Sequence, residues 1–104
     1  MQNSLFETVP EPGKHGFYSE RACKERRNRI KIAVAAYSYE IENNPIMSDE
    51  QFDSLAKTIN LELKTGFKKL DDFFLSEFQP HTGQWIHKHP ELNKIAGIYN
   101  RLKR

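Results

Sequence analysis

The sequence predicts an all-α fold: a small single domain of about four helices built on a helical hairpin, with an extended N-terminal arm. Apolar residues recur every three or four positions in several segments, and prolines and glycines separate those segments. No segment shows the regular alternation of a strand. Because 104 residues support one domain but not two, we assign residues 1–18 to the arm and residues 19–104 to the helical domain.

The arm is predicted from its prolines and aromatic residues. Pro10 and Pro12 each remove a backbone donor, so a helix is unfavourable there. Phe6, Phe17 and Tyr18 lie in the same segment. We therefore expect the arm to dock onto the helical domain or onto a partner.

The first helix is predicted from the N-cap Ser19 to about Asn43. Asn43-Asn44-Pro45 ends it, because the residue before a proline is displaced from the helical region. Small and apolar residues recur along one face, and the alanines allow close approach of another helix. These residues are Ile30, Ala33, Val34, Ala36, Tyr37 and Ile41.

The second helix is predicted from Ser48 to about Lys64. Ser48 and Gln51 have the spacing of a capping box, and acidic residues follow the cap, where the helix dipole favours them. Thr65-Gly66 is expected to close the helix. Its apolar stripe would be Phe52, Leu55, Ile59 and Leu63.

Two further helices are predicted in the C-terminal half. One begins near residues 68–71 and carries Leu70 and three phenylalanines, and a loop at 79–83 follows it. Trp85 and Ile86 would form a short turn, and Pro90 would stand at the first position of the last helix. The stripe of that helix is Leu92, Ile95, Ile98, Tyr99 and Leu102.

The turn between the first two predicted helices carries a specific pattern. Along the chain, Tyr39-Glu40 is followed after four residues by Pro45, then by Met47-Ser48-Asp49, by Phe52-Asp53 and by Leu55. This order resembles the N-terminal helical domain of NAD-dependent DNA ligases, which binds the nicotinamide mononucleotide (NMN) half of NAD. The positions in register are Tyr39, Pro45, Ser48, Asp49, Asp53 and Leu55. The chain departs from the family pattern at Glu40 (His or Tyr in the family), Met47 (Ile or Val) and Phe52 (Tyr).

The resemblance implies a ligand site at Tyr39, Asp49, Phe52 and Asp53, and NAD or NMN as the possible ligand. The carboxylates would hydrogen-bond the nucleotide and the aromatic rings would stack on it. Glu40 would place a carboxylate near the nucleotide's phosphate, and Phe52 lacks the tyrosine hydroxyl. Alternatively, Asp49 serves only the helix N-terminus and Asp53 pairs with a lysine or arginine.

No catalytic residue, resident cofactor or metal is predicted. The chain has no Lys-x-Asp-Gly adenylation motif and no four-cysteine zinc site, so an isolated copy of this helical domain cannot seal DNA. His81, His87 and His89 do not match a zinc pattern. We expect a protein that is not an enzyme.

Charge is segregated along the chain. Arg and Lys outnumber acidic residues between positions 20 and 31, whereas positions 40–53 hold only acidic charges. Separated charges can orient a small protein on a partner, although they can also be ordinary solvated helix faces. The basic 21–31 helix could also contact nucleic-acid phosphates. The predicted partner-binding residues are Glu40, Glu42, Arg26, Arg27 and Trp85.

Together these features predict a non-catalytic small binding protein. Small proteins that carry a fragment of a larger enzyme's fold are typical of phages and mobile elements. We therefore expect an interaction module, or an inhibitor of host machinery such as a defence system, that acts through a charged helical surface. The alternative is a stand-alone NAD- or NMN-binding module. One cysteine, and no apolar run near the roughly 20 residues of a membrane span, predict a cytoplasmic protein without membrane contact.

Overall fold

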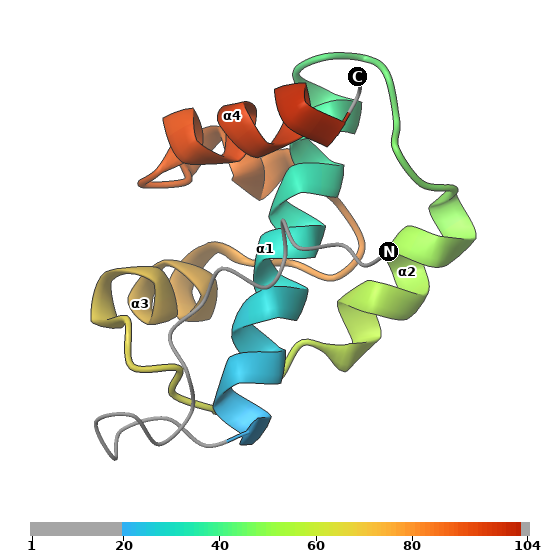
Figure 1. The fold of residues 1–104 in the computed structure, drawn as a ribbon. Coiled ribbons are helices and arrows are strands. Elements are labelled where there is room, and N and C mark those ends of the chain that lie inside the picture. The colour runs from blue at the N-terminus through green and yellow to red at the C-terminus, as the bar shows by residue number, and fades with distance from the viewer. Residues whose placement is uncertain (1–19, 103–104) are drawn as a thin grey trace.

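The computed structural model describes residues 20–102, and this part of the chain is all-α, as predicted (Figure 1). No strand occurs within it. The predicted arm at residues 1–18 and the proposed N-cap Ser19 lie outside the described residues. The elements are α1 (Glu20–Glu40), α2 (Asp49–Thr58), α3 (Lys68–Glu77), the 3-10 helix η2 (Gln84–Lys88) and α4 (Leu92–Leu102).

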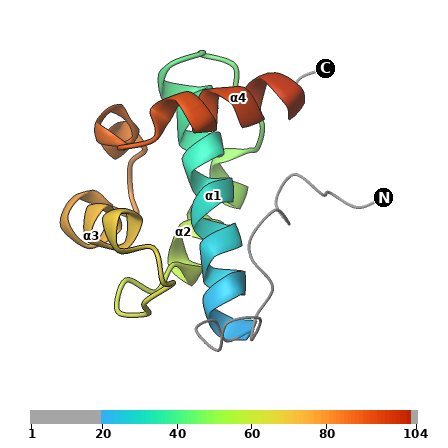
Figure 2. The same ribbon diagram turned by 60° about the vertical axis from the view of Figure 1, so that its left-hand side comes forward.

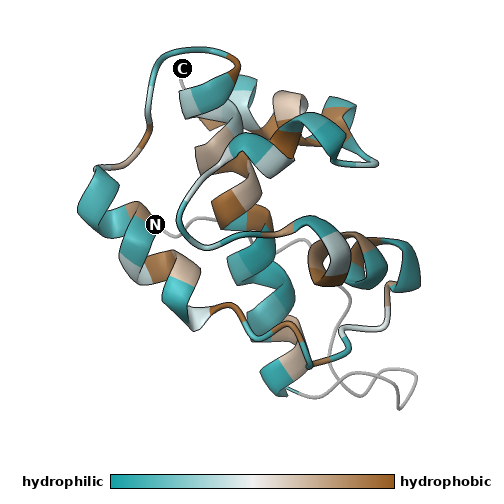
Figure 3. Ribbon diagram, turned by 180° about the vertical axis from the view of Figure 1, so that it is seen from behind, coloured by the Kyte–Doolittle hydropathy of each residue, from teal (hydrophilic) through white to brown (hydrophobic). Residues whose placement is uncertain are grey.

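Helix α1 is the centre of the fold. It contacts α2, η2 and α4, and α4 crosses it near its C-terminal end (Figures 1 and 2). Every residue from 32 to 38 is buried. Figure 3 shows that the N-terminal half of α1 is largely hydrophilic and that its C-terminal half is mostly hydrophobic. The apolar half is covered by other elements, while the polar half keeps a solvated face.

The aromatic cluster between α3 and η2 forms part of the core. The rings of Phe74 and Phe78 lie 5.5 and 5.2 Å from that of Trp85, centroid to centroid. The indole nitrogen of Trp85 donates a hydrogen bond of 2.7 Å to the carbonyl of Thr82, and only 5% of the residue is exposed. Trp85, which the sequence predicts as a partner-binding residue, is thus buried by the cluster, and an internal acceptor binds its one donor.

Helix α2 ends at Thr58, six residues before the predicted end at Lys64. The following segment turns back over α1, where the buried Arg29 donates to the carbonyls of Asn60 (2.8 Å) and Leu63 (3.0 Å). A longer helix would use the Asn60 carbonyl for its own backbone hydrogen bond. The apolar stripe predicts that the helix continues beyond Thr58. In the structure, carbonyl groups of this segment accept hydrogen bonds from the distant Arg29 instead.

The other boundaries differ by only a few residues. Helix α1 stops at Glu40, and Asn43 adopts a left-handed conformation (φ 54°) that reverses the chain. Asparagine tolerates this conformation better than most residues. Helix α4 begins at Leu92, so Pro90 lies in the turn before it and not at its first position.

Candidate functional site

A cavity of about 430 Å³ opens where the end of α1, the turn after it, the start of α2 and the loop before η2 meet. It brings together all four residues predicted to bind a ligand, and Glu40 with them. Three segments of the chain line it: Ala35, Tyr39 and Glu40; Pro45, Met47, Ser48, Asp49, Phe52 and Asp53; and His81, Thr82, Gly83 and Gln84.

The start of α2 is fixed by the predicted capping box. The Ser48 hydroxyl accepts a hydrogen bond from the Gln51 backbone N–H (3.1 Å), and the Ser48 N–H donates to the Gln51 side-chain oxygen (2.9 Å). Asp49 and Asp53 follow on one face of the helix because they are four residues apart. The cap therefore sets where these two carboxylates lie relative to α1.

The turn from residue 41 to residue 48 is anchored by Ser38. This serine is fully buried; its hydroxyl donates to the Ala35 carbonyl (2.7 Å) and accepts from the Ile46 N–H (3.1 Å). Its own carbonyl accepts from the Asn44 N–H (2.7 Å). Sequence reasoning missed Ser38. The available signal was a serine that directly follows the apolar run from Ile32 to Tyr37.

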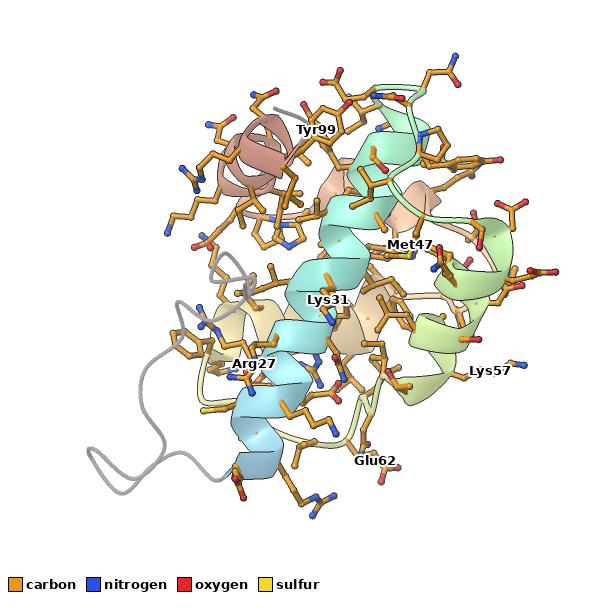
Figure 4. The ribbon with its side chains drawn as sticks, turned by 45° about the vertical axis from the view of Figure 1, so that its right-hand side comes forward. Arg27, Lys31, Met47, Lys57, Glu62 and Tyr99 are labelled. Atoms are coloured by element: carbon orange, nitrogen blue, oxygen red, sulfur yellow. The ribbon has the colours of Figure 1, made fainter. Side chains whose placement is uncertain are left out.

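A second anchor and a methionine complete this side of the cavity. The side-chain amide of Asn44 donates to the Tyr99 hydroxyl on α4 (3.0 Å). Met47 lies between α1 and the start of α2 (Figure 4). The turn is thus held by α1 and α4 together, and its residues present a defined wall to the cavity.

The wall formed by residues 81–84 depends on a glycine. A Cβ atom placed on Gly83 would lie 3.1 Å from the Cβ of Ala36, closer than ordinary van der Waals contact. At Ala36, one of the small residues on α1, it is this loop that approaches the helix closely. This contact brings the exposed side chain of His81 to the cavity. No residue spacing in the sequence indicates that His81 lies next to the hairpin.

The charges around the cavity are negative. Glu40, Asp49 and Asp53 contribute carboxylates, and no lysine or arginine lines it within residues 20–102. Neither aspartate forms an ion pair with a described residue. Two aromatic rings share the wall: Tyr39 is 54% exposed and Phe52 is half-buried.

The predicted partner-binding residues do not form one surface. Glu42, in the turn after α1, accepts a hydrogen bond from the Tyr37 hydroxyl (2.9 Å) and does not line the cavity. Burial and, secondly, this bond raise the pKa of Tyr37. Arg26 lies in the other half of α1 with its guanidinium 3.9 Å from the centre of the Phe67 ring. Arg27 is half-buried and lies on the same side of α1 as Lys31 (Figure 4).

Outside the cavity, the half-buried His89 has a perturbed pKa. Burial lowers its pKa to about 4, partly opposed by the nearby Glu91. Its Nδ1 atom accepts a hydrogen bond from the Glu91 backbone N–H (3.0 Å), and its ring lies edge-on to Phe73. His89 is therefore held neutral as a structural acceptor.

Neither a metal centre nor a membrane span occurs in the described part of the chain. No group of three or more His, Cys, Asp or Glu side chains in residues 20–102 could hold a metal ion. None of the helices described is long and apolar enough to cross a membrane.

Comparisons with known proteins gave no match. No model of a protein family, no curated protein and no solved structure was found to be similar to this chain. The cavity and the residues that line it are therefore the features from which a function can be inferred.

Proposed function

We propose that this protein is a non-catalytic binding module that holds a nicotinamide-bearing nucleoside or nucleotide between α1 and α2. One observation carries the proposal: Tyr39, Asp49, Phe52 and Asp53, selected by their resemblance to the ligase domain, line a single cavity of about 430 Å³. That volume lies within the range of about 300 to 1,000 Å³ typical of small-molecule sites.

The side chains in the cavity suit the chemistry of such a ligand. Ionised Asp49 and Asp53 are acceptors, and ribose hydroxyls and the nicotinamide carboxamide are donors. Tyr39 and Phe52 offer flat apolar surfaces to the pyridine ring. The sequence lacks an adenylation lysine motif, so binding without turnover is the function that these residues support.

Calorimetric titration with nicotinamide riboside, NMN and NAD tests this proposal. Asp53→Asn and Tyr39→Ala should each weaken binding by about tenfold, the effect of losing one charge-assisted hydrogen bond or one aromatic contact. Glu62→Gln is the matched control, because Glu62 is an exposed carboxylate outside the cavity (Figure 4). Absence of binding to all three compounds at millimolar concentration would refute the proposal.

A second candidate function, an interaction protein of a phage or mobile element that inhibits or adapts host machinery, is favoured by the charge distribution on α1. Glu40 is the last residue of α1 and Glu42 lies in the turn after it, whereas Lys24, Arg27 and Lys31 lie in the N-terminal half of the helix. Lys24 and Glu40 are 16 residues apart on this helix, which separates them by about 24 Å along its axis. Such a separation can orient the protein on a partner with complementary charges.

Capture of partners from a host lysate distinguishes the two functions. Changing Glu40, Glu42 and Asp49 together to lysine should abolish capture of a protein partner, whereas Glu62→Lys should not. Nuclease treatment during capture separates protein from nucleic-acid binding by the basic 21–31 segment. Unchanged capture by the triple variant would reject the acidic surface as the docking site.

A further inference from the structure

The charges that line the cavity narrow the class of ligand, an inference that rests on the proposed function. Glu40 contributes a carboxylate from α1, and Asp49 and Asp53 contribute two from the first turns of α2. The cavity is thus acidic on both sides of the hairpin. Among the described residues that line it, no lysine or arginine offsets these charges.

Among the described residues that line the cavity, no lysine or arginine is present to pair with a phosphate group. Proteins bind phosphate with Arg or Lys side chains or with the free N–H groups of a helix N-terminus. At the start of α2, the N–H groups of Ser48 and Gln51 are already bound by the two side chains of the capping box. Asp49 and Glu50 place negative charge at the same helix end.

A cation, in contrast, is favoured by two kinds of side chain. The oxidised nicotinamide ring of a nucleoside is a pyridinium and carries a positive charge. Carboxylates attract that charge, and the faces of Tyr39 and Phe52 attract it through their π electrons. We propose that the cavity selects the oxidised, unphosphorylated nicotinamide nucleoside over its 5′-phosphate and over the dinucleotide. Glu40 is the residue that excludes the phosphate.

The test compares three ligands by calorimetry on the full chain. They are nicotinamide riboside, a cation; its 1,4-dihydro form, which is neutral; and NMN, which adds a phosphate. The riboside should bind at least about fivefold more tightly than either the dihydro form or NMN. This is the size of effect expected from carboxylates that are partly exposed to solvent. Added salt should narrow the difference between the riboside and NMN.

Glu40→Gln should reduce the preference for the riboside over NMN, since it removes one carboxylate from the cavity. Glu42→Gln is the matched control, because Glu42 lies two residues away and outside the cavity. NMN binding as tightly as the riboside would overturn the inference and leave the proposed function standing. Equal binding of the dihydro form would overturn the role of the positive charge. An unchanged preference in Glu40→Gln would overturn the role of Glu40. Failure of nicotinamide riboside, NMN and NAD alike to bind would refute the proposed function itself.

Discussion

Arg29 belongs by sequence to the basic segment of α1, yet its guanidinium is buried and makes four hydrogen bonds inside the protein. Its partners are Glu25 (2.8 Å), Asp71 (2.9 Å) and the carbonyls of Asn60 and Leu63. These bonds join α1 to α3 and to the segment between α2 and α3. Arg29 is therefore not available to a nucleic acid, and the basic surface predicted over residues 21–31 is smaller than the sequence indicates.

We expect Arg29→Lys to lower the free energy of unfolding by about 2 kcal/mol or more. Lysine keeps the charge but cannot reach all four acceptors, and a buried acceptor without a donor is costly. Arg27→Lys is the matched control on the same helix and should change stability by less than about 0.5 kcal/mol. Urea denaturation of both variants measures the difference. Equal stability of the two would show that the network contributes little.

At the same scale, His89 makes stability depend on pH. Its pKa is about 4 in the folded protein and 6.5 in the unfolded chain. Between these values the unfolded state binds more protons, so the free energy of unfolding falls as the pH falls from 6.5 to 4. The stability that neutral His89 contributes is fully present above pH 6.5. Protonation would also turn Nδ1 from an acceptor into a donor and break its bond with the Glu91 N–H.

The variant His89→Asn tests this linkage, because an asparagine oxygen can accept the same bond without titrating. Urea denaturation at pH 7 and pH 4 should show that the wild type loses about 1 to 3 kcal/mol more than His89→Asn. His87→Asn, at an exposed histidine, should keep the wild-type pH dependence. If all three proteins lose the same stability, the carboxylates and not His89 govern the acid response.

At the scale of elements, α2 depends on its N-terminal cap. The helix has only ten residues and a single buried residue, Ala56. A short helix with so little burial gains much of its stability from its ends. Because the same cap positions Asp49 and Asp53, the stability of α2 and the shape of the cavity are linked.

Ser48→Ala should therefore destabilise the protein by about 1 kcal/mol, the usual effect of losing an N-cap side chain. Ser54→Ala is the control, since Ser54 is exposed in the middle of the same helix. Thermal denaturation gives the stability change, and hydrogen exchange of the α2 amides locates it. Faster exchange confined to other helices would contradict the role of the cap.

At the scale of the whole molecule, the cavity exists because the loop at 79–83 packs against α1. Gly83 permits this approach, and its neighbours across the contact are Ala36 and Glu40. Any side chain at Gly83 must displace the loop or α1. The distance between loop and helix thus controls both packing and the width of the cavity.

Gly83→Val should lower the free energy of unfolding by about 1 to 3 kcal/mol, the typical cost of overpacking. It should also weaken binding of nicotinamide riboside. Gly97→Val is the control, because a Cβ at Gly97 in α4 meets no atom within 4 Å; its effect should be within about 0.5 kcal/mol. Urea denaturation and calorimetry measure the two effects. Wild-type behaviour of Gly83→Val would show that the loop adapts without consequence.

The sequence by itself determined the all-α class, the capping box of Ser48 and Gln51 and the order of the helices. These features follow from local physics: the spacing of apolar residues, backbone restrictions at proline, and hydrogen bonds between residues three apart. The hairpin pattern also selected Tyr39, Asp49, Phe52 and Asp53, which the structure places in one cavity. Nearby residues could be predicted because their relative positions follow from helix geometry alone.

Only the tertiary structure decided where α2 ends, that Trp85 is buried and that His81 reaches the cavity. Each outcome depends on contacts between residues far apart in the sequence: Arg29 with the Asn60 carbonyl, the aromatic cluster around Trp85, and Gly83 against Ala36. Such contacts are set by how whole faces pack, and residue spacing does not encode them. For the same reason, only the placement of α1, α2 and the loop together shows that no lysine or arginine among the described residues joins the acidic side chains in the cavity.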